Sequence, residues 1–297
     1  MRYRRLGKTS LTVSALGLGC APMSRHNAPI DDGESVATIH RALDLGVTFF
    51  DTSDVYGAGH NETIVGQALQ GQRHKVVLAT KWGSLFLPSG ERGRDGTPEN
   101  ALRSCEASLR RLRSDAIDIY YLHRLDPAVP LEDSVGAMAR LVDAGKVRYL
   151  GMSASTPSQL RRAHEVHPIT VLESEYSLFV RELEREVIPL CRQLDVDFVP
   201  YAPLWRGVIA GTYYRNQVVH PGDQSGNQER WGERDGEFLR PVRELAARKQ
   251  ATAAQIALAW LLAYGGYQDG AGPADPRDHL RCQRRRFRIR CLSQYPA

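Results

Sequence analysis

The chain has 297 residues, of which 42% are hydrophobic and 25% are charged, and its formal net charge is +5. This length and composition predict a globular protein with one large α/β domain or two smaller ones. No apolar run is long enough to cross a bilayer, and the first residues lack the apolar stretch of a signal peptide. We therefore expect a cytoplasmic protein with no membrane partner.

The distribution of charge argues against a nucleic-acid partner. Residues 264–297 contain seven Arg and three Asp, a net charge of +4, which leaves only +1 for the first 263 residues. The five cysteines are odd in number, scattered and free of any C-x-x-C pair, so they predict reduced thiols and no zinc site. We expect no metal in this protein.

Short apolar runs alternate with amphipathic stretches of helical period along most of the chain. The predicted strands cover residues 13–19, 47–52, 76–81, 117–123, 147–153, 169–174 and 197–203. The predicted helices lie between them, at about 34–45, 61–70, 98–113, 132–144, 157–166 and 181–193.

Strands of near-continuous apolar character, each followed by a helix, indicate parallel strands covered on their outer face. No G-x-G-x-x-G motif follows the first strand. The pattern therefore favours an α/β fold of the (β/α)₈ TIM-barrel type over a doubly wound sheet, and a barrel predicts that the chemistry gathers at the C-terminal strand ends.

Ionisable residues close three successive predicted strands, namely Asp51, Lys81 and His123, and Tyr56 follows Asp51 by five positions. A single strand-end lysine usually faces solvent, and a single histidine is more often structural. Exposure to solvent explains one such residue, but it does not readily explain four ionisable groups at the same level of a barrel. Their combination therefore favours a catalytic site.

These residue types suit the reduction of a carbonyl group, in which the oxygen gains negative charge and must be protonated. Tyr56 can donate that proton, although a free phenol has a pKa of about 10. We expect the Lys81 ammonium to lower the phenol pKa and Asp51 to hold the ammonium in place. His123 can donate a hydrogen bond to the carbonyl oxygen and orient the substrate.

The stretches "GVTFFDTSDVYGAGHNE", "VLATKWG" and "IDIYYLHRLD" resemble those of the aldo-keto reductases. The opening "RRLGKTSLTVS" is similar to a bacterial branch that also resembles the β-subunits of voltage-gated potassium channels. This resemblance implies a (β/α)₈ barrel, NADPH and NADP⁺ as cofactor, and a catalytic tetrad of Asp51, Tyr56, Lys81 and His123.

The resemblance also implies cofactor contacts, with departures from the family pattern. Ser153 matches the first residue of a Ser-Asn pair that binds the nicotinamide carboxamide, whereas Ala154 replaces the Asn. Glu173 stands where a Gln usually completes that contact, and a carboxylate can still accept from the amide NH₂. Tyr201 matches the aromatic residue that stacks on the nicotinamide ring.

Two backbone segments complete the expected cofactor site. The segment "APLWRG" resembles a phosphate-binding loop that includes Ala202, Leu204 and Gly207, with Ala202 in a usual Ser position. Gly19 would let the backbone approach the cofactor, and a tight turn at the barrel mouth explains it equally well.

The family pattern stops after "ATAAQIALAWLLAYGG". We therefore expect a barrel over residues 1–263 and an atypical basic tail over 264–297, with the eighth strand and the final helix atypical or missing. The arginine-rich tail is explained either by a change of reading frame or by genuine divergence.

The predicted function is the NADPH-dependent reduction of an aldehyde or ketone, such as a sugar or a small metabolite. The alternatives are a non-catalytic, cofactor-sensing subunit and an inactive barrel that has lost its adenosine-phosphate pocket.

Overall fold

The computed structural model describes residues 1–24, 31–87, 89, 91–211 and 235–264. These residues divide into two compact units. The first holds the described residues up to 201 except 175–181, and the second holds 175–181 and the described residues from 202 onward.

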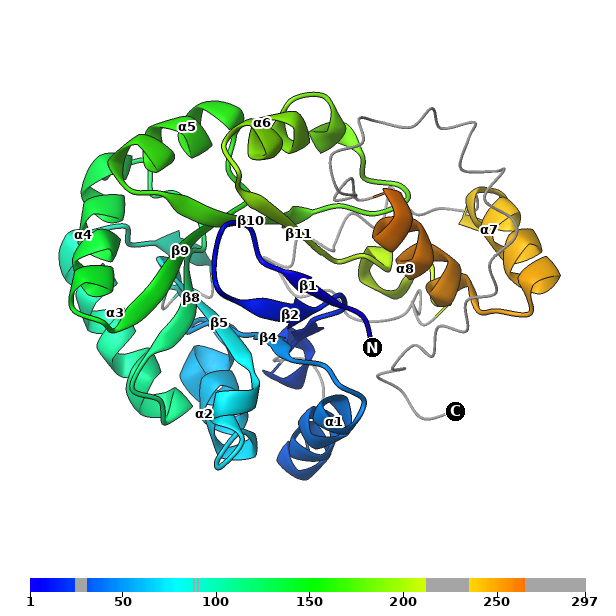
Figure 1. Cartoon of the computed structure of the whole chain (residues 1–297), viewed down its shortest axis with the longest axis horizontal. Helices are drawn as coiled ribbons and strands as arrows, with labels where there is room; N and C mark the ends of the chain where they lie inside the picture. Colours follow the sequence, from blue (N-terminus) through cyan, green and yellow to red (C-terminus); the bar gives the residue numbers. More distant parts are fainter. Residues whose placement is uncertain (25–30, 88, 90, 212–234, 265–297) are drawn as a thin grey trace. The chain divides into compact units, whose positions relative to one another are not determined.

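A seven-stranded sheet forms the wall of the first unit. Its strands, in spatial order, are β3 (Leu18–Gly19), β4 (Phe49–Asp51), β5 (Val77–Trp82), β8 (Ile117–Leu122), β9 (Val147–Ser153), β10 (Ile169–Glu175) and β11 (Asp197–Tyr201). The pairs from β3 to β10 are parallel and follow the chain order. The predicted α/β barrel class is confirmed, and Figure 1 shows the strands forming a curved wall with helices outside.

Six helices connect the wall strands and lie on their outer side (Figure 1). They are α1 (Asp32–Asp44), α2 (His60–Ala68), α3 (Pro98–Leu112), α4 (Leu131–Asp143), α5 (Pro157–Val166) and α6 (Val187–Gln193). Side chains of Asp31, Thr97 and Thr156 cap α1, α3 and α5 by accepting backbone N–H groups.

The last of these helices is shorter than the predicted 181–193. Residues Glu182–Glu184 form a separate 3₁₀ turn, and α6 begins only at Val187. Pro189 accounts for the difference, because proline is tolerated in the first turn of a helix but breaks its interior.

The predicted strand 13–19 is wrong, because the structure splits it in two. Residues Thr12–Ser14 (β2) pair antiparallel with Tyr3–Arg5 (β1), and only β3 joins the wall. Between β2 and β3, Ser14 Oγ donates to the carbonyl of Leu16 at 2.7 Å. A Cβ at Gly17 would lie 2.8 Å from the Phe49 ring, so the chain passes this ring only as glycine.

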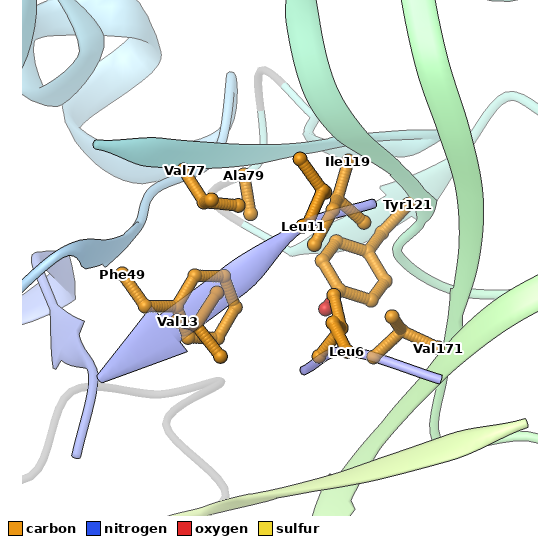
Figure 2. Packing of buried hydrophobic residues seen from close by; sticks show 9 residues of the cluster. All are labelled: Leu6, Leu11, Val13, Phe49, Val77, Ala79, Ile119, Tyr121 and Val171. Atoms are coloured by element: carbon orange, nitrogen blue, oxygen red, sulfur yellow. The ribbon is translucent and has the colours of Figure 1, made fainter. Parts of the chain in front are cut away.

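The hairpin β1–β2 plugs the barrel. Leu6, Leu11 and Val13 are buried against apolar side chains that point inward from the wall, as Figure 2 shows. The wall side chains of this cluster are Phe49, Val77, Ala79, Ile119, Tyr121 and Val171. Burying a large aliphatic or aromatic side chain stabilises a fold by about 1.5–3 kcal/mol. The plug therefore ties the N-terminus to strands from β4 to β10.

A second hairpin, β6 (Ser84–Phe86) and β7 (Arg92–Arg94), follows β5. The second unit contains α7 (Asp235–Lys249) and α8 (Ala253–Tyr264), with Val208, Ile209, Leu239 and Ala257 in its core. None of the helices in the described residues is long and apolar enough to cross a membrane. The predicted tail at 264–297 lies almost wholly outside the described residues, as does any eighth strand formed by it, so the boundary at 263 stays a prediction.

Candidate active site

The four predicted catalytic side chains come together at the C-terminal ends of β4, β5 and β8. Asp51 ends β4 and makes an ion pair with Lys81 of β5. Lys81 Nζ lies 5.4 Å from the centre of the Tyr56 ring. His123 follows β8, and its ring meets the Tyr56 ring edge-on at 5.9 Å between centroids. These contacts place the four side chains beside one another at the same edge of the wall, and their catalytic role stays a prediction.

Lys81 is almost wholly buried, and its ammonium lies against three oxygen atoms, one each from Asp51, Thr52 and Glu173. Its ammonium donates to Asp51 and, at 3.1 Å, to the carbonyl of Thr52, and it lies 3.3 Å from Glu173 Oε2. Burial alone would lower the pKa of Lys81, but the charges of Asp51, Glu173 and Tyr56 outweigh it and raise the pKa above its ordinary value. Lys81 therefore carries its positive charge at any pH near neutrality.

The phenol of Tyr56 has a raised pKa, contrary to the sequence-based expectation. Burial raises the pKa of Tyr56 to about 12, and the charges of Asp51 and Glu173 act in the same direction. Lys81 opposes them and lowers the phenol pKa, as expected, but it does not outweigh burial. Tyr56 is thus protonated at neutral pH.

The turn that carries Tyr56 is fixed by buried polar contacts. Residues Tyr56–Gly59 form a tight turn in which Gly57 and Gly59 adopt φ values of 58° and 92°. Behind it, Asn61 donates to the carbonyl of Cys20 at 2.8 Å and accepts from Thr52 Oγ1 at 2.6 Å. The loops after β3 and β4 are therefore joined to the start of α2, which places the phenol.

A buried ion pair between Glu62 and Arg111 lies next to this turn and to β5. Glu62 of α2 accepts from Thr80 Oγ1 at 2.6 Å and from Arg111 Nε at 2.7 Å, and its side chain is fully buried. Because Thr80 precedes Lys81 on β5, this network anchors the strand beside Lys81. Burial and the negative charge of Glu62 raise the pKa of the nearby Asp54 to about 7.

His123 is neutral in this environment. Burial and the positive charges of Lys81, Arg124 and Arg92 hold the pKa of His123 well below its ordinary value. Its Nδ1 lies 3.2 Å from Ser53 Oγ. When the serine hydroxyl donates to Nδ1, the imidazole carries its proton on Nε2, where it can serve as a hydrogen-bond donor.

Sequence reasoning missed Arg124, which directly follows His123. Its guanidinium donates to Ser153 Oγ at 2.8 Å and to the Tyr201 hydroxyl at 3.5 Å. Both acceptors belong to the predicted nicotinamide site, so Arg124 connects the ends of β8, β9 and β11. Its place on the same strand end as His123 was the signal that could have identified it.

The remaining predicted cofactor residues fall into two groups. Gly19 pairs with Asp51 across β3 and β4, and among the residues that the structure describes a Cβ at Gly19 would meet no atom within 4 Å, which leaves open space beside this backbone. Ala202, Leu204 and Gly207 belong to the second unit, and their predicted role in the same cofactor site stays a prediction. Within the described residues, no group of His, Cys, Asp or Glu side chains could hold a metal ion.

Comparisons with a family model and with a curated protein both point to the same family. A model of the aldo/keto reductase family matches residues 15–273. A probable aldo-keto reductase of Glycine max is 41% identical over 270 residues, which is 88% of this chain and 77% of that protein.

Two solved structures share the fold along most of their length. A glycerol dehydrogenase from Gluconobacter oxydans has a TM-score of 0.80 and 29% identity, with 88% of this chain and 83% of that chain covered. An aldo/keto reductase from Klebsiella pneumoniae, solved with NADP and acetate, has a TM-score of 0.66 and 30% identity over 84% of this chain and 78% of that chain.

Proposed function

Because this chain belongs to the aldo-keto reductase family, we propose that it reduces an aldehyde or a ketone to an alcohol with NADPH as the cofactor. The observation that carries the proposal is the gathering of Tyr56, Lys81, Asp51 and His123 at one end of the barrel wall. An acid, a cation beside it and a neutral hydrogen-bond donor are the groups that carbonyl reduction needs.

The strand ends around the tetrad suit a nicotinamide. Ser153 Oγ accepts from Arg124, which leaves its own hydroxyl proton free to donate to a carboxamide oxygen. The open space above Gly19 would accept a group that approaches the backbone beside Asp51. When bound there, the nicotinamide supplies a hydride to the carbonyl carbon.

The chain's own residues handle the proton. Tyr56 is protonated at neutral pH, and its O–H bond breaks as the developing alkoxide takes the proton. Lys81 stabilises the resulting phenolate, and Asp51 and the Thr52 carbonyl keep the ammonium in place. His123, protonated on Nε2, donates a hydrogen bond to the carbonyl oxygen and so orients the substrate.

The substrate class we favour is a small polar carbonyl compound, such as a sugar or a small metabolite. The similarity to a glycerol dehydrogenase supports this choice, because oxidation of a polyol is the reverse of the reduction of a hydroxylated carbonyl.

The proposed function is tested by a fluorescence titration with NADPH, followed by turnover of a panel of aldehydes and ketones. Tyr56→Phe should abolish turnover and leave NADPH binding nearly unchanged, because the lost hydroxyl is the proton donor. Tyr121→Phe is the matched control, since its buried hydroxyl has no hydrogen-bond partner in the described part of the chain. Near wild-type turnover by Tyr56→Phe would remove Tyr56 from the mechanism. NADPH binding without turnover of any carbonyl would indicate a cofactor-sensing protein.

A further inference from the structure

Glu173, on β10, is a second carboxylate on the catalytic lysine. Its side chain is 9% exposed, and its Oε2 lies 3.3 Å from Lys81 Nζ. Glu173 Oε2 and the Lys81 ammonium form an ion pair, but their geometry is not that of a hydrogen bond. Among the described residues, no other donor forms a hydrogen bond to this oxygen. The ammonium is already hydrogen-bonded to Asp51 and to the Thr52 carbonyl, so the function of Glu173 here is electrostatic.

Two carboxylates and one ammonium leave a net charge of −1 beside the phenol when both acids are ionised. The ionisable groups that interact with this cluster come from separate elements: Asp51 of β4, Tyr56 of the turn that follows it, Lys81 of β5, Tyr121 of β8, His123 directly after β8 and Cys20 after β3. In a buried site such charges are poorly screened, so each one changes the proton affinity of its neighbours.

We propose that Glu173 is a positioning residue that acts through Lys81: it supplies a second counter-charge to the ammonium and strengthens the hold of Tyr56 on its proton. The proposal rests on the proposed function of Tyr56 as the acid. With Glu173 ionised, Lys81 is shared between two carboxylates and gives less stabilisation to a phenolate. The phenol consequently stays available as an acid up to a higher pH.

This role differs from the one expected from the sequence, in which Glu173 accepts from the nicotinamide carboxamide. If that contact were its main role, replacing Glu173 would change NADPH affinity and leave the titration of Tyr56 unchanged. If the electrostatic role holds, the titration changes even without the cofactor.

The direct test follows the ionisation of Tyr56 by NMR in protein labelled with ¹³C-tyrosine, with the signal assigned by Tyr56→Phe. Glu173→Gln removes the charge and keeps the size, and it should lower the titration midpoint of Tyr56 by roughly one pH unit or more. Glu173→Asp keeps the charge and should restore most of the wild-type midpoint. Glu175→Gln is the matched control on the same strand, because its carboxylate pairs with Arg206, and it should leave the midpoint unchanged.

The same variants should alter catalysis in a corresponding way. The loss of reductase activity at high pH should begin about one pH unit lower in Glu173→Gln than in the wild type. A Tyr56 midpoint in Glu173→Gln identical to that of the wild type would overturn the proposal. Because the NMR titration requires neither substrate nor turnover, failure of the proposed function would be recognised separately by the carbonyl panel.

Discussion

Ala154→Asn should make this protein both more stable and better at binding its cofactor. Ala154 follows β9 with a φ of 54°, in the left-handed region, and it is exposed. A left-handed conformation costs an L-residue roughly 1–2 kcal/mol, and asparagine tolerates it better than alanine. We expect a gain of about 0.5–1 kcal/mol, or about 1–4 °C in melting temperature.

The cofactor effect can be separated from the stability effect by a matched variant. Ala154→Gly relieves the same backbone strain but brings no amide, so it should raise the melting temperature without changing NADPH affinity. Ala154→Asn adds an amide next to Ser153, and one net hydrogen bond contributes about 0.5–1.5 kcal/mol. NADPH affinity should therefore increase about 2- to 12-fold by that arithmetic.

Differential scanning calorimetry and a fluorescence titration with NADPH measure the two effects. The strain argument would be refuted if neither variant were more stable than the wild type. Equal NADPH affinities of the Asn and Gly variants would show that position 154 lies away from the carboxamide.

Two further predictions concern Asp118 and Asp54. Asp118→Asn should reduce the free energy of unfolding in urea by about 2–4 kcal/mol, because Asp118 is buried against Arg73 at 2.7 Å and Arg148 at 3.0 Å. Glu106→Gln, in an exposed pair, should cost less than about 1 kcal/mol, and equal losses would contradict the argument. Asp54 has a folded-state pKa of about 7, above its unfolded value of about 4, so the stability it contributes at low pH is lost progressively as pH rises from about 4 to 7. Asp54→Asn should therefore be the more stable protein at pH 8, and a difference from wild type that is independent of pH would count against this assignment.

The sequence predicted the barrel wall well because its strands are buried on both faces. Runs such as Val77–Trp82 and Ile117–Leu122 are apolar almost throughout, and the structure buries every residue in them. The hairpin β1–β2 was missed because its strands are short and its partner residues lie far along the chain. Periodicity reports the local pattern and does not show which distant surface a segment covers.

Asp51, Tyr56, Lys81 and His123 lie close together because parallel strands place their C-terminal ends at one edge. The electrostatics of the site were less predictable. Whether Tyr56 has a raised or a lowered pKa depends on the balance between burial and the surrounding charges, and a motif does not give that balance. The distance between Glu173 and Lys81 likewise depends on the curvature of the wall between β5 and β10.

The plug formed by the N-terminal hairpin has a consequence for synthesis in the cell. Val13 is made early, but Val171, one of its packing partners, emerges about 160 residues later, which is roughly 8–30 s at ordinary rates of translation. During this delay Leu6, Leu11 and Val13 have no complete core to enter. A nascent chain that has not yet reached β10 should therefore expose an apolar N-terminal segment, and holdase chaperones should bind this segment.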